Sequence, residues 1–326
     1  MRASPPAARQ GLRATVAGCS SRPAEANPIP DTLVTHDMQT PTLSCEFFPP
    51  RTPEAIARLD LACRELAALG PEFFSVTFGA GGSTRDLTLE TVQRIHAQTG
   101  IDTAPHLSCI GTPIAELREV LARYRAQDIR RLVLLRGDMP SGMTGFGELR
   151  YASELVAFVR AETGDHFHIE VAAYPEFHPQ AASAAADLAN FRRKVEAGAN
   201  SAITQYFFNP DAYFRFRDDC TRVGIGIPLV PGIMPITNYT QLARFSEMCG
   251  AEIPRWVTRR LRDFGDDRDS LRAFGLEVTT ALCARLLEGG APGLHFYSMN
   301  QHEATTAVCR AIGLAGPRTG EDANAR

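Results

Sequence analysis

Charged side chains directly follow an apolar segment near the middle of the sequence. Four apolar residues at 132–135 precede Arg136, Gly137 and Asp138, which place a cation, a closely approachable backbone and a carboxylate together. A short, uninterrupted apolar run is typical of a strand buried on both faces. The sequence therefore predicts a cluster of polar groups at the end of a buried strand. The alternative is an exposed turn closed by an Arg–Asp ion pair.

A carboxyl group stands in apolar surroundings closer to the N-terminus. Glu46 lies between Cys45 and Phe47, and Pro49 and Pro50 end the segment. Burial disfavours the charged form of a carboxyl group and raises its pKa, so Glu46 is a candidate general acid near neutral pH. The alternative is a glutamate on the solvated side of a short edge strand.

Apolar segments of this kind recur along the chain roughly every 30 residues, the spacing of a strand followed by a crossover helix. Eight such segments end near Phe47, Phe78, Cys109, Gly137, Tyr174, Tyr206, Ile233 and Ser298. The sequence therefore predicts an α/β fold, a TIM (β/α)8 barrel with extra helices before the last strand. Because active sites of such barrels lie at the carboxyl ends of the strands, Glu46 and Asp138 are expected to meet there.

The segments that flank this pattern differ from it in composition. Residues 1–40 are rich in Ala, Arg, Pro and Ser and are expected to be a disordered N-terminal extension. An organelle transit peptide has a similar composition, and Met38 is an alternative start. Residues 41–315 are expected to form the catalytic barrel, and residues 316–326 a polar C-terminal tail.

Bulk composition narrows the classes of function. A net charge of −3 and a pI of about 6.3 argue against a surface for nucleic acid or an anionic membrane. The longest uncharged run, 223–242, contains three prolines, so no transmembrane helix is expected. The eight cysteines include no C-x-x-C pair, which favours reduced thiols in the cytoplasm, and no metal site is expected.

Several residues near the predicted strand ends are candidates for ligand contacts. His106 lies in the third segment, where a core histidine with satisfied hydrogen bonds is the alternative. Tyr174 and His178 flank Pro175, and this rigid turn could hold two rings over a flat ligand. Gln205 could pair its amide with the edge of a heterocycle.

One predicted helix, at residues 183–199, carries a mixed polar face. Asp187, Asn190 and Lys194 share that face, with Arg193 beside them. An acid, an amide and two cations suit a ribose and pyrophosphate, and an ordinary solvated helix face is the alternative. The glycines at 79–82 lack the spacing of a dinucleotide-binding loop, and the loop at 139–150 is a candidate cover for a ligand.

Eight short motifs, one for each predicted strand, carry a family resemblance. They are Cys45-Glu-Phe-Phe-Pro-Pro-Arg51, Ser75-Val-Thr-Phe-Gly-Ala80, Ala104-Pro-His-Leu-Ser-Cys109, Leu135-Arg-Gly-Asp138, Ala172-Ala-Tyr-Pro-Glu176, Ala202-Ile-Thr-Gln-Tyr-Phe-Phe208, Pro231-Gly-Ile-Met-Pro235 and His295-Phe-Tyr-Ser-Met-Asn300. In this order they resemble the barrel-strand motifs of the 5,10-methylenetetrahydrofolate reductase family, over about residues 42–313.

The resemblance implies a barrel that holds FAD and reduces 5,10-methylenetetrahydrofolate to 5-methyltetrahydrofolate with NADH or NADPH. One open face of the flavin would then serve both hydride transfers, which predicts ping-pong kinetics. It implies that Glu46 protonates the folate ring nitrogen and that Asp138 lies between flavin and pterin. The residues implied in FAD binding are Thr77, Phe78, Ala80, His106, Arg136, Gly137, Asp138, Ala152, Tyr174, His178, Ala181, Asp187, Asn190, Arg193 and Lys194. Those implied in substrate binding are Asp138, Gln205, Gln241, Phe245 and Gln301.

One position departs from the pattern of bacterial members of the family. Gln301 stands where the resemblance implies an arginine for the glutamate tail of the folate, and an amide cannot supply a charge-assisted bidentate pair. His302 or another cation is then expected to compensate. No further domain is expected after the barrel, and a homo-oligomer is expected. A flavin-free pterin methyltransferase and a non-catalytic binding barrel are the rival functions.

Overall fold

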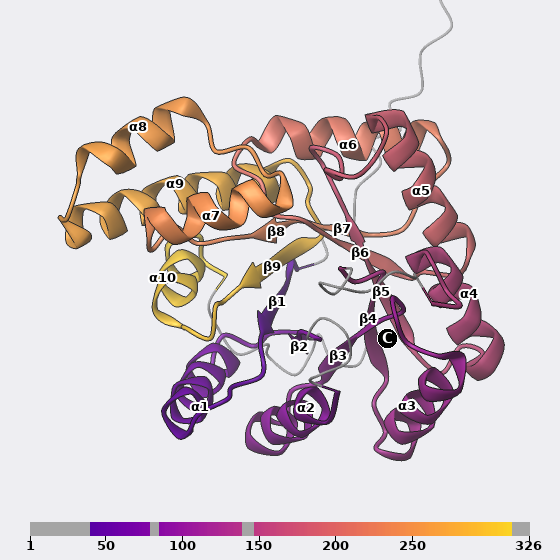
Figure 1. The fold of residues 1–326 in the computed structure, drawn as a ribbon. Helices are drawn as coiled ribbons and strands as arrows, with labels where there is room; N and C mark the ends of the chain where they lie inside the picture. Colours follow the sequence, from indigo (N-terminus) through magenta and orange to yellow (C-terminus); the bar gives the residue numbers. More distant parts are fainter. Residues whose placement is uncertain (1–39, 79–84, 139–146, 315–326) are drawn as a thin grey trace, which may run out of the picture. The chain divides into compact units, whose positions relative to one another are not determined.

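The computed structural model describes residues 40–78, 85–138 and 147–314, in which parallel strands alternate with helices around a barrel (Figure 1). The strands are β1 (Thr42–Phe47), β2 (Phe73–Val76), β3 (Thr103–Ser108), β4 (Arg131–Leu135), β5 (His168–Ala173), β6 (Ser201–Thr204), β7 (Leu229–Val230), β8 (Gly232–Ile233) and β9 (Gly293–Tyr297). The predicted TIM barrel is confirmed.

Helices follow most strands and surround the sheet (Figure 1). They are α1 (Pro53–Ala67), α2 (Arg85–Thr99), α3 (Ile114–Ala126), α4 (Ala152–Thr163), α5 (Ala184–Glu196), α6 (Pro210–Arg222), α7 (Tyr239–Cys249), α8 (Arg255–Asp263), α9 (Arg268–Glu288) and α10 (Glu303–Ala311). The extra helices predicted before the last strand are α7 and α8. The 21-residue helix α9, which leads into β9, was not predicted.

The seventh strand closes the barrel in two pieces, which corrects the single segment predicted to end near Ile233. β7 pairs with β6, and β8 pairs with β9, so the strand changes partner at Pro231. Proline has no backbone N–H to donate, but its carbonyl oxygen still accepts from His295 N at 3.0 Å. Gly232 is required here because a Cβ would lie 2.1 Å from the Thr204 carbonyl oxygen.

Side-chain caps start several helices close to the carboxyl ends of the strands. Thr52 Oγ1 accepts from Ala55 N at 3.2 Å at the start of α1. Ser183 caps α5 and Asn238 caps α7 in the same way. Such caps satisfy N–H groups that the first helical turn leaves unpaired. They therefore fix each chain reversal beside the barrel mouth.

Apolar side chains form separate layers around and inside the barrel. The main core packs the outer faces of the strands against the helices. Inside the barrel, Phe73, Ala104, Val133 and Ile203 form a smaller cluster, as expected where alternate strand residues point inward. A third cluster, which includes Tyr206, Met234 and Leu261, packs the segments that follow β6 and β8 against the additional helices. This layer supports the rim of the mouth.

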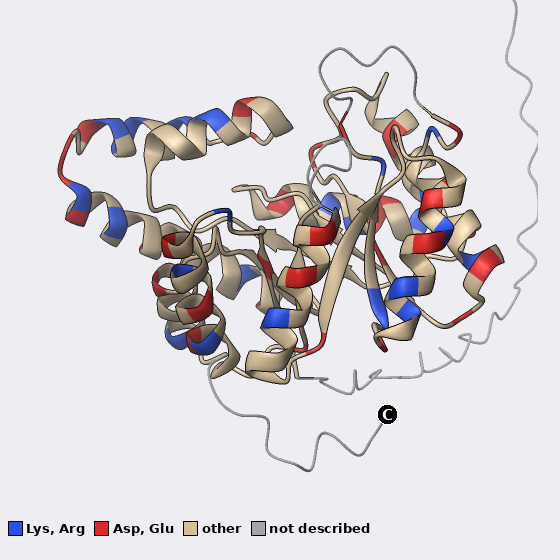
Figure 2. Ribbon diagram, turned by 60° about the horizontal axis from the view of Figure 1, so that its bottom comes forward, with Lys and Arg blue, Asp and Glu red and all other residues tan. Residues whose placement is uncertain are grey.

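The outer surface carries both signs of charge. Acidic and basic segments alternate along the helices (Figure 2). Within the described residues, no helix is long and apolar enough to cross a membrane. The seven cysteines in those residues are all free thiols, and six of them are buried.

A buried ion cluster lies at the amino ends of β4, β5 and β6, opposite the mouth. Arg131 donates to Glu170 Oε1 at 2.6 Å and to Glu72 Oε1 at 2.7 Å. Ser201 Oγ donates to the second oxygen of Glu170 at 2.6 Å. Burial alone would raise the pKa of Glu170, but His168, Arg131 and Ser201 outweigh burial and lower it. The cluster therefore holds Glu170 as a carboxylate inside the barrel.

Replacement of Arg131 tests this cluster. We expect Arg131→Met to lower the free energy of unfolding by about 3–5 kcal/mol at neutral pH, because it leaves buried carboxylates without their cation. The neighbouring Arg130 is 59% exposed at its side chain, so the control Arg130→Met should cost under about 1 kcal/mol. Urea unfolding measures both values.

The effect of Arg131→Met should also depend on pH. The folded-state pKa of Glu170 is lowered, so its stabilising contribution is present above the unfolded value of about 4.3 and is lost as pH falls through the folded value. We therefore expect the gap between Arg131→Met and the parent protein to narrow in acid. A gap that stays constant down to that range would contradict the role given to Glu170.

Candidate active site

The carboxyl ends of β1, β3 and β9 bring an acid and two imidazoles together. Glu46 Oε2 lies 3.4 Å from His106 Nε2 and 3.8 Å from His295 Nε2. Both distances exceed the usual range of an N–H···O hydrogen bond, so these groups are in contact without being bonded. Neither Nε2 atom has a hydrogen-bond partner among the described residues. A ligand atom or a proton on Glu46 could complete this arrangement.

Burial differs between the acid and the two imidazoles. His295 is 0% exposed and His106 is 5% exposed, whereas the side chain of Glu46 is 19% exposed. The other ring nitrogen of His295, Nδ1, lies 2.7 Å from Ser44 Oγ. Glu46 therefore lies between the buried interior of the barrel and its open mouth.

His106 is uncharged at neutral pH. The pKa of His106 is lowered to about 4, mainly by burial; the Glu46 carboxylate opposes the shift and His295 contributes to it. The alternative of a core histidine with satisfied hydrogen bonds does not hold, because Nε2 has no partner in the described part of the chain. No imidazolium charge from His106 therefore stands beside Glu46.

The segment after β4 forms a tight turn that carries Arg136, Gly137 and Asp138. Gly137 has a φ of +84°, and a Cβ there would lie 2.8 Å from Ser108 Cβ, so a side chain would be excluded. Arg136 donates to Gln180 Oε1 at 2.6 Å. Among the described residues, Arg136 therefore bonds Gln180 and the Gly137 carbonyl oxygen. This differs from the alternative of an exposed turn closed by an Arg–Asp ion pair. Asp138 is exposed at the rim.

The two predicted rings after β5 lie against each other. The ring centroids of Tyr174 and His178 are 4.6 Å apart, and the rings meet edge to face at 68°. Phe177, which lies between them in the sequence, has a φ of +68°, which is unusual for a residue with a side chain. Burial, together with the Asp187 and Asp138 carboxylates, raises the pKa of Tyr174 to about 12. These contacts place β4, β5 and α5 around one rim.

The polar residues of α5 lie on a helix, as predicted, but make separate contacts. Asp187 Oδ2 accepts from His178 N at 2.9 Å and so fixes the turn after β5. Arg193 donates to Asn190. Lys194 Nζ donates to the carbonyl oxygen of Ala172, at the end of β5. Burial lowers the pKa of Lys194 to about 8, against the influence of Asp187.

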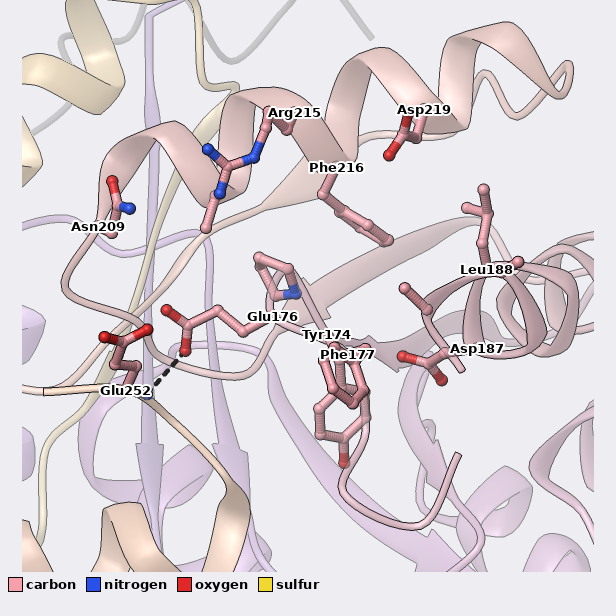
Figure 3. A pocket seen from close by; sticks show the side chains of 14 residues that line it. Tyr174, Glu176, Phe177, Asp187, Leu188, Asn209, Arg215, Phe216, Asp219 and Glu252 are labelled. Atoms are coloured by element: carbon pink, nitrogen blue, oxygen red, sulfur yellow. Dashed lines mark hydrogen bonds between the residues drawn. The ribbon is translucent and has the colours of Figure 1, made fainter. Parts of the chain in front are cut away.

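A cavity of about 580 Å³ lies between α5 and α6 beside this turn. Figure 3 shows Asp187 and Leu188 on one side and Arg215, Phe216 and Asp219 on the other. Asp187 thus contacts both the turn after β5 and this cavity.

The residues expected to bind substrate lie at different depths. Gln205 and Tyr174 border a second, much smaller cavity, and Gln205 Oε1 accepts from the backbone N–H of Tyr206 at 3.0 Å. Phe245 is partly buried on α7, where it packs against the cluster that contains Tyr206. Gln241 and Gln301 are exposed.

The remaining predicted FAD contacts are small or apolar. Thr77 and Phe78 follow β2 and are half-buried. Ala152 begins α4, and Ala181 N donates to His178 O at 2.9 Å. Ala80, the glycines at 79–82 and most of the predicted cover at 139–150 lie outside the described residues.

Sequence reasoning missed His295 and Ser44, which complete the surroundings of Glu46. A signal for them was present, because strand residues two apart point to the same side. Ser44 precedes Glu46 by two positions, and β9 pairs its His295 with Ser44. Ser298 and Asn300 were also missed, and both lie at the exit of β9.

Comparison with known proteins identifies a family. Residues 33–313 match the family model described as methylenetetrahydrofolate reductase. The chain is 42% identical over 272 residues to the 5,10-methylenetetrahydrofolate reductase of Escherichia coli strain K12, covering 83% of this chain and 90% of the relative. It is 37% identical over 284 residues to a probable methylenetetrahydrofolate reductase (NADH) of rice, covering 83% of this chain and 48% of the relative.

A solved structure shares the fold. It is an uncharacterized protein from Clostridium thermocellum that binds two copies of 5-methyl-5,6,7,8-tetrahydrofolic acid, with a TM-score of 0.60 and 17% sequence identity. The match covers 85% of this chain and 94% of that chain. At this level of identity the likeness supports the barrel architecture alone.

Titration of His106 tests the geometry around Glu46. In protein labelled with carbon-13 at histidine Cε1, we expect the His106 signal, assigned with His106→Gln, to titrate near pH 4. It should stay in the neutral form between about pH 5 and 8. In Glu46→Gln the midpoint should fall further, because the carboxylate is the group that raises it. A midpoint near the ordinary 6.5, or an upward shift in Glu46→Gln, would contradict the described contacts.

Proposed function

The chain belongs to the methylenetetrahydrofolate reductase family, and we propose that it reduces 5,10-methylenetetrahydrofolate to 5-methyltetrahydrofolate with FAD and a nicotinamide cofactor. The observation that carries the mechanism is the position of Glu46, a carboxyl group held against two buried imidazoles at the barrel mouth. Asp138 stands on the rim of the same mouth. The barrel at residues 41–315 is the proposed catalytic domain.

Glu46 is the proposed general acid and would take up its proton in the complex with the folate. Its neighbour His106 is uncharged, so no imidazolium beside Oε2 holds Glu46 in the carboxylate form. A carboxylic acid there can donate that proton to the folate ring nitrogen, which opens the five-membered ring to an iminium carbon. Asp138, an exposed carboxylate on the rim, would stabilise the resulting cation by charge attraction.

The described residues fit FAD at several points. Lys194 presents an amine whose pKa is lowered by burial, and a phosphate close to it would raise that pKa and favour the ammonium form. Lys194 is also the one lysine among the 34 lysines and arginines of the chain. This position therefore has an amine, whereas the other 33 have guanidinium groups. Tyr174 and His178 offer adjoining rings, and Gly137 leaves the backbone open to close approach.

Bound FAD supplies hydride transfer between the nicotinamide and the folate. The FAD contacts proposed from Thr77 to Lys194 are those of the family resemblance, and Glu46, Asp138 and Gln205 approach the same mouth. A single mouth for both substrates favours alternation between them, so we propose ping-pong kinetics. A ternary complex of enzyme, nicotinamide and folate would contradict this order.

NADH is the proposed nicotinamide cofactor. The names of three plant relatives, from rice, Arabidopsis thaliana and maize, specify NADH. Gln241, Phe245 and Gln301 are the proposed further substrate contacts. Because Gln301 carries no charge, the folate tail would be held by hydrogen bonds or by another cation. Cytoplasmic location, supported by the free thiols, and a homo-oligomer are part of the same proposal.

Lys194 gives a direct test of the FAD site. With carbon-13 at lysine Cε, the protein has a single labelled lysine, which should titrate near pH 8 without FAD and higher with FAD bound. Lys194→Gln should weaken FAD binding by about 10- to 100-fold, because a bond to a charged group is lost. Fluorescence titration measures the affinity. Arg192→Gln, on the same helix and paired with Glu196, is the control and should leave the affinity near that of the parent.

Replacement of Glu46 separates the two half-reactions. Purified protein should show the visible spectrum of a flavin, which the flavin-free methyltransferase would not. In Glu46→Gln, reduction of that flavin by NADH should stay within about threefold of the parent protein, while folate reduction falls by about 10²- to 10⁴-fold. Stopped-flow absorbance follows each step. Glu54→Gln, an exposed change on α1, is the control. Equal losses in both half-reactions would remove the assigned role.

A further inference from the structure

The exit of β9 holds the exit of β1 through two buried side chains. Ser298 Oγ donates to the backbone carbonyl oxygen of Glu46 at 2.6 Å. Asn300 Nδ2 donates to the Phe48 carbonyl oxygen at 2.9 Å, and Asn300 Oδ1 accepts from Phe48 N at 3.0 Å. Ser298 and Asn300, here called the β9 clamp, are 5% and 3% exposed. The two residues therefore hydrogen-bond the backbone of Glu46 and of Phe48, on both sides of Phe47.

The clamp provides hydrogen bonds to the backbone just after β1, where pairing between the strands stops. β1 ends at Phe47, and Phe48 is 40% exposed, so packing does not hold the next residue in place. Asn300 bonds both the N–H and the C=O of Phe48, as a neighbouring strand would. Ser298 Oγ also accepts from Asn300 N at 3.2 Å, which joins the two clamp residues.

The backbone of the clamp is held in a costly conformation. Met299 and Asn300 both have a φ of +54°, in the left-handed region, which asparagine tolerates better than most residues but methionine seldom adopts. Strain of this kind persists where surrounding contacts enforce it, and it gathers at functional sites. Here the contacts that enforce it are those to Glu46 and Phe48.

The clamp acts on the residue that the mechanism uses. Ser298 bonds the carbonyl group of Glu46 itself and lies three positions after His295, whose Nε2 faces the Glu46 carboxyl. The Glu46 side chain is 19% exposed, so it has room to turn toward the mouth. Fixing its backbone against β9 keeps the carboxyl group directed at the two imidazoles.

We propose that Ser298 and Asn300 are positioning residues for Glu46, and that their hydrogen bonds set the direction from which it delivers a proton to the folate. This inference rests on the proposed function. Its geometric part, the orientation of the carboxyl group, can be measured without FAD or substrate.

The test uses Asn300→Gly, which relieves the positive φ and removes both bonds to Phe48, so that loss of the bonds is separated from backbone strain. Asn300→Ala and Ser298→Ala are parallel variants, and Ser298→Thr keeps the hydroxyl group and should restore function. Asn200→Ala is the matched control, because Asn200 accepts from Ile169 N at 2.8 Å at the opposite end of the barrel.

We expect the clamp variants to lose about 10- to 100-fold in the rate of folate reduction with little change in KM, because the acid is misplaced. Flavin reduction by NADH should change by less than about twofold, because that step does not use Glu46. A purely structural role would instead lower both half-reactions together, or only the stability, and so would overturn the proposal. Parent-like folate reduction in Asn300→Gly would also overturn it.

The titration midpoint of the His106 carbon-13 signal provides a measurement that does not depend on catalysis. If the Glu46 carboxyl group turns away in Asn300→Gly, the His106 midpoint should fall as it does in Glu46→Gln, and Asn200→Ala should leave it unchanged. An unchanged midpoint in Asn300→Gly would overturn the positioning role. If the parent protein failed to reduce folate, the proposed function would fall, and this shift would still decide whether the clamp orients Glu46.

Discussion

At Pro231 the seventh strand changes from pairing with β6 to pairing with β9, and the closure of the barrel depends on this change of partner. β7 continues the sheet from β6, and β8 joins it to β9. Because β9 also pairs with β1, closure places Glu46 next to His295 and Tyr297. Tyr297 then reaches across to β6, where its hydroxyl group donates to the Thr204 carbonyl oxygen at 2.8 Å. The mouth is therefore assembled by pairing between strands that are far apart in the sequence.

The sequence predicted the barrel and the acid because both leave local signals. Each strand is a short apolar run with polar residues at its carboxyl end, and Glu46 and Asp138 follow this pattern. It did not predict α9, and the reason is physical. The buried face of α9 includes Gly275 and Thr279, so it lacks a continuous apolar stripe. Gly275 is needed there because a Cβ would lie 2.1 Å from the Ile236 carbonyl oxygen.

The surroundings of Glu46 were less accessible to sequence reasoning. His106 was identified as a candidate, but its unpaired nitrogen depends on which groups the neighbouring strands present. His295 and Asn300 act on Glu46 and Phe48 from about 250 residues away, a separation that only strand pairing brings to contact distance. Positions two apart in β1 and β9 contain the signal, but strand order is needed to combine them.

The two ends of the barrel differ in how their buried charged and polar groups are paired. At the amino end, the Arg131 guanidinium pairs with the carboxylates of Glu72 and Glu170, and Ser201 also donates to Glu170. At the mouth, the buried Nε2 atoms of His106 and His295 have no partner in the described residues. Leaving a buried polar group unpaired costs about 1–3 kcal/mol, so folding alone does not favour this arrangement. The clamp adds backbone strain at the same place. The groups at the mouth therefore keep capacity for hydrogen bonds to a bound ligand.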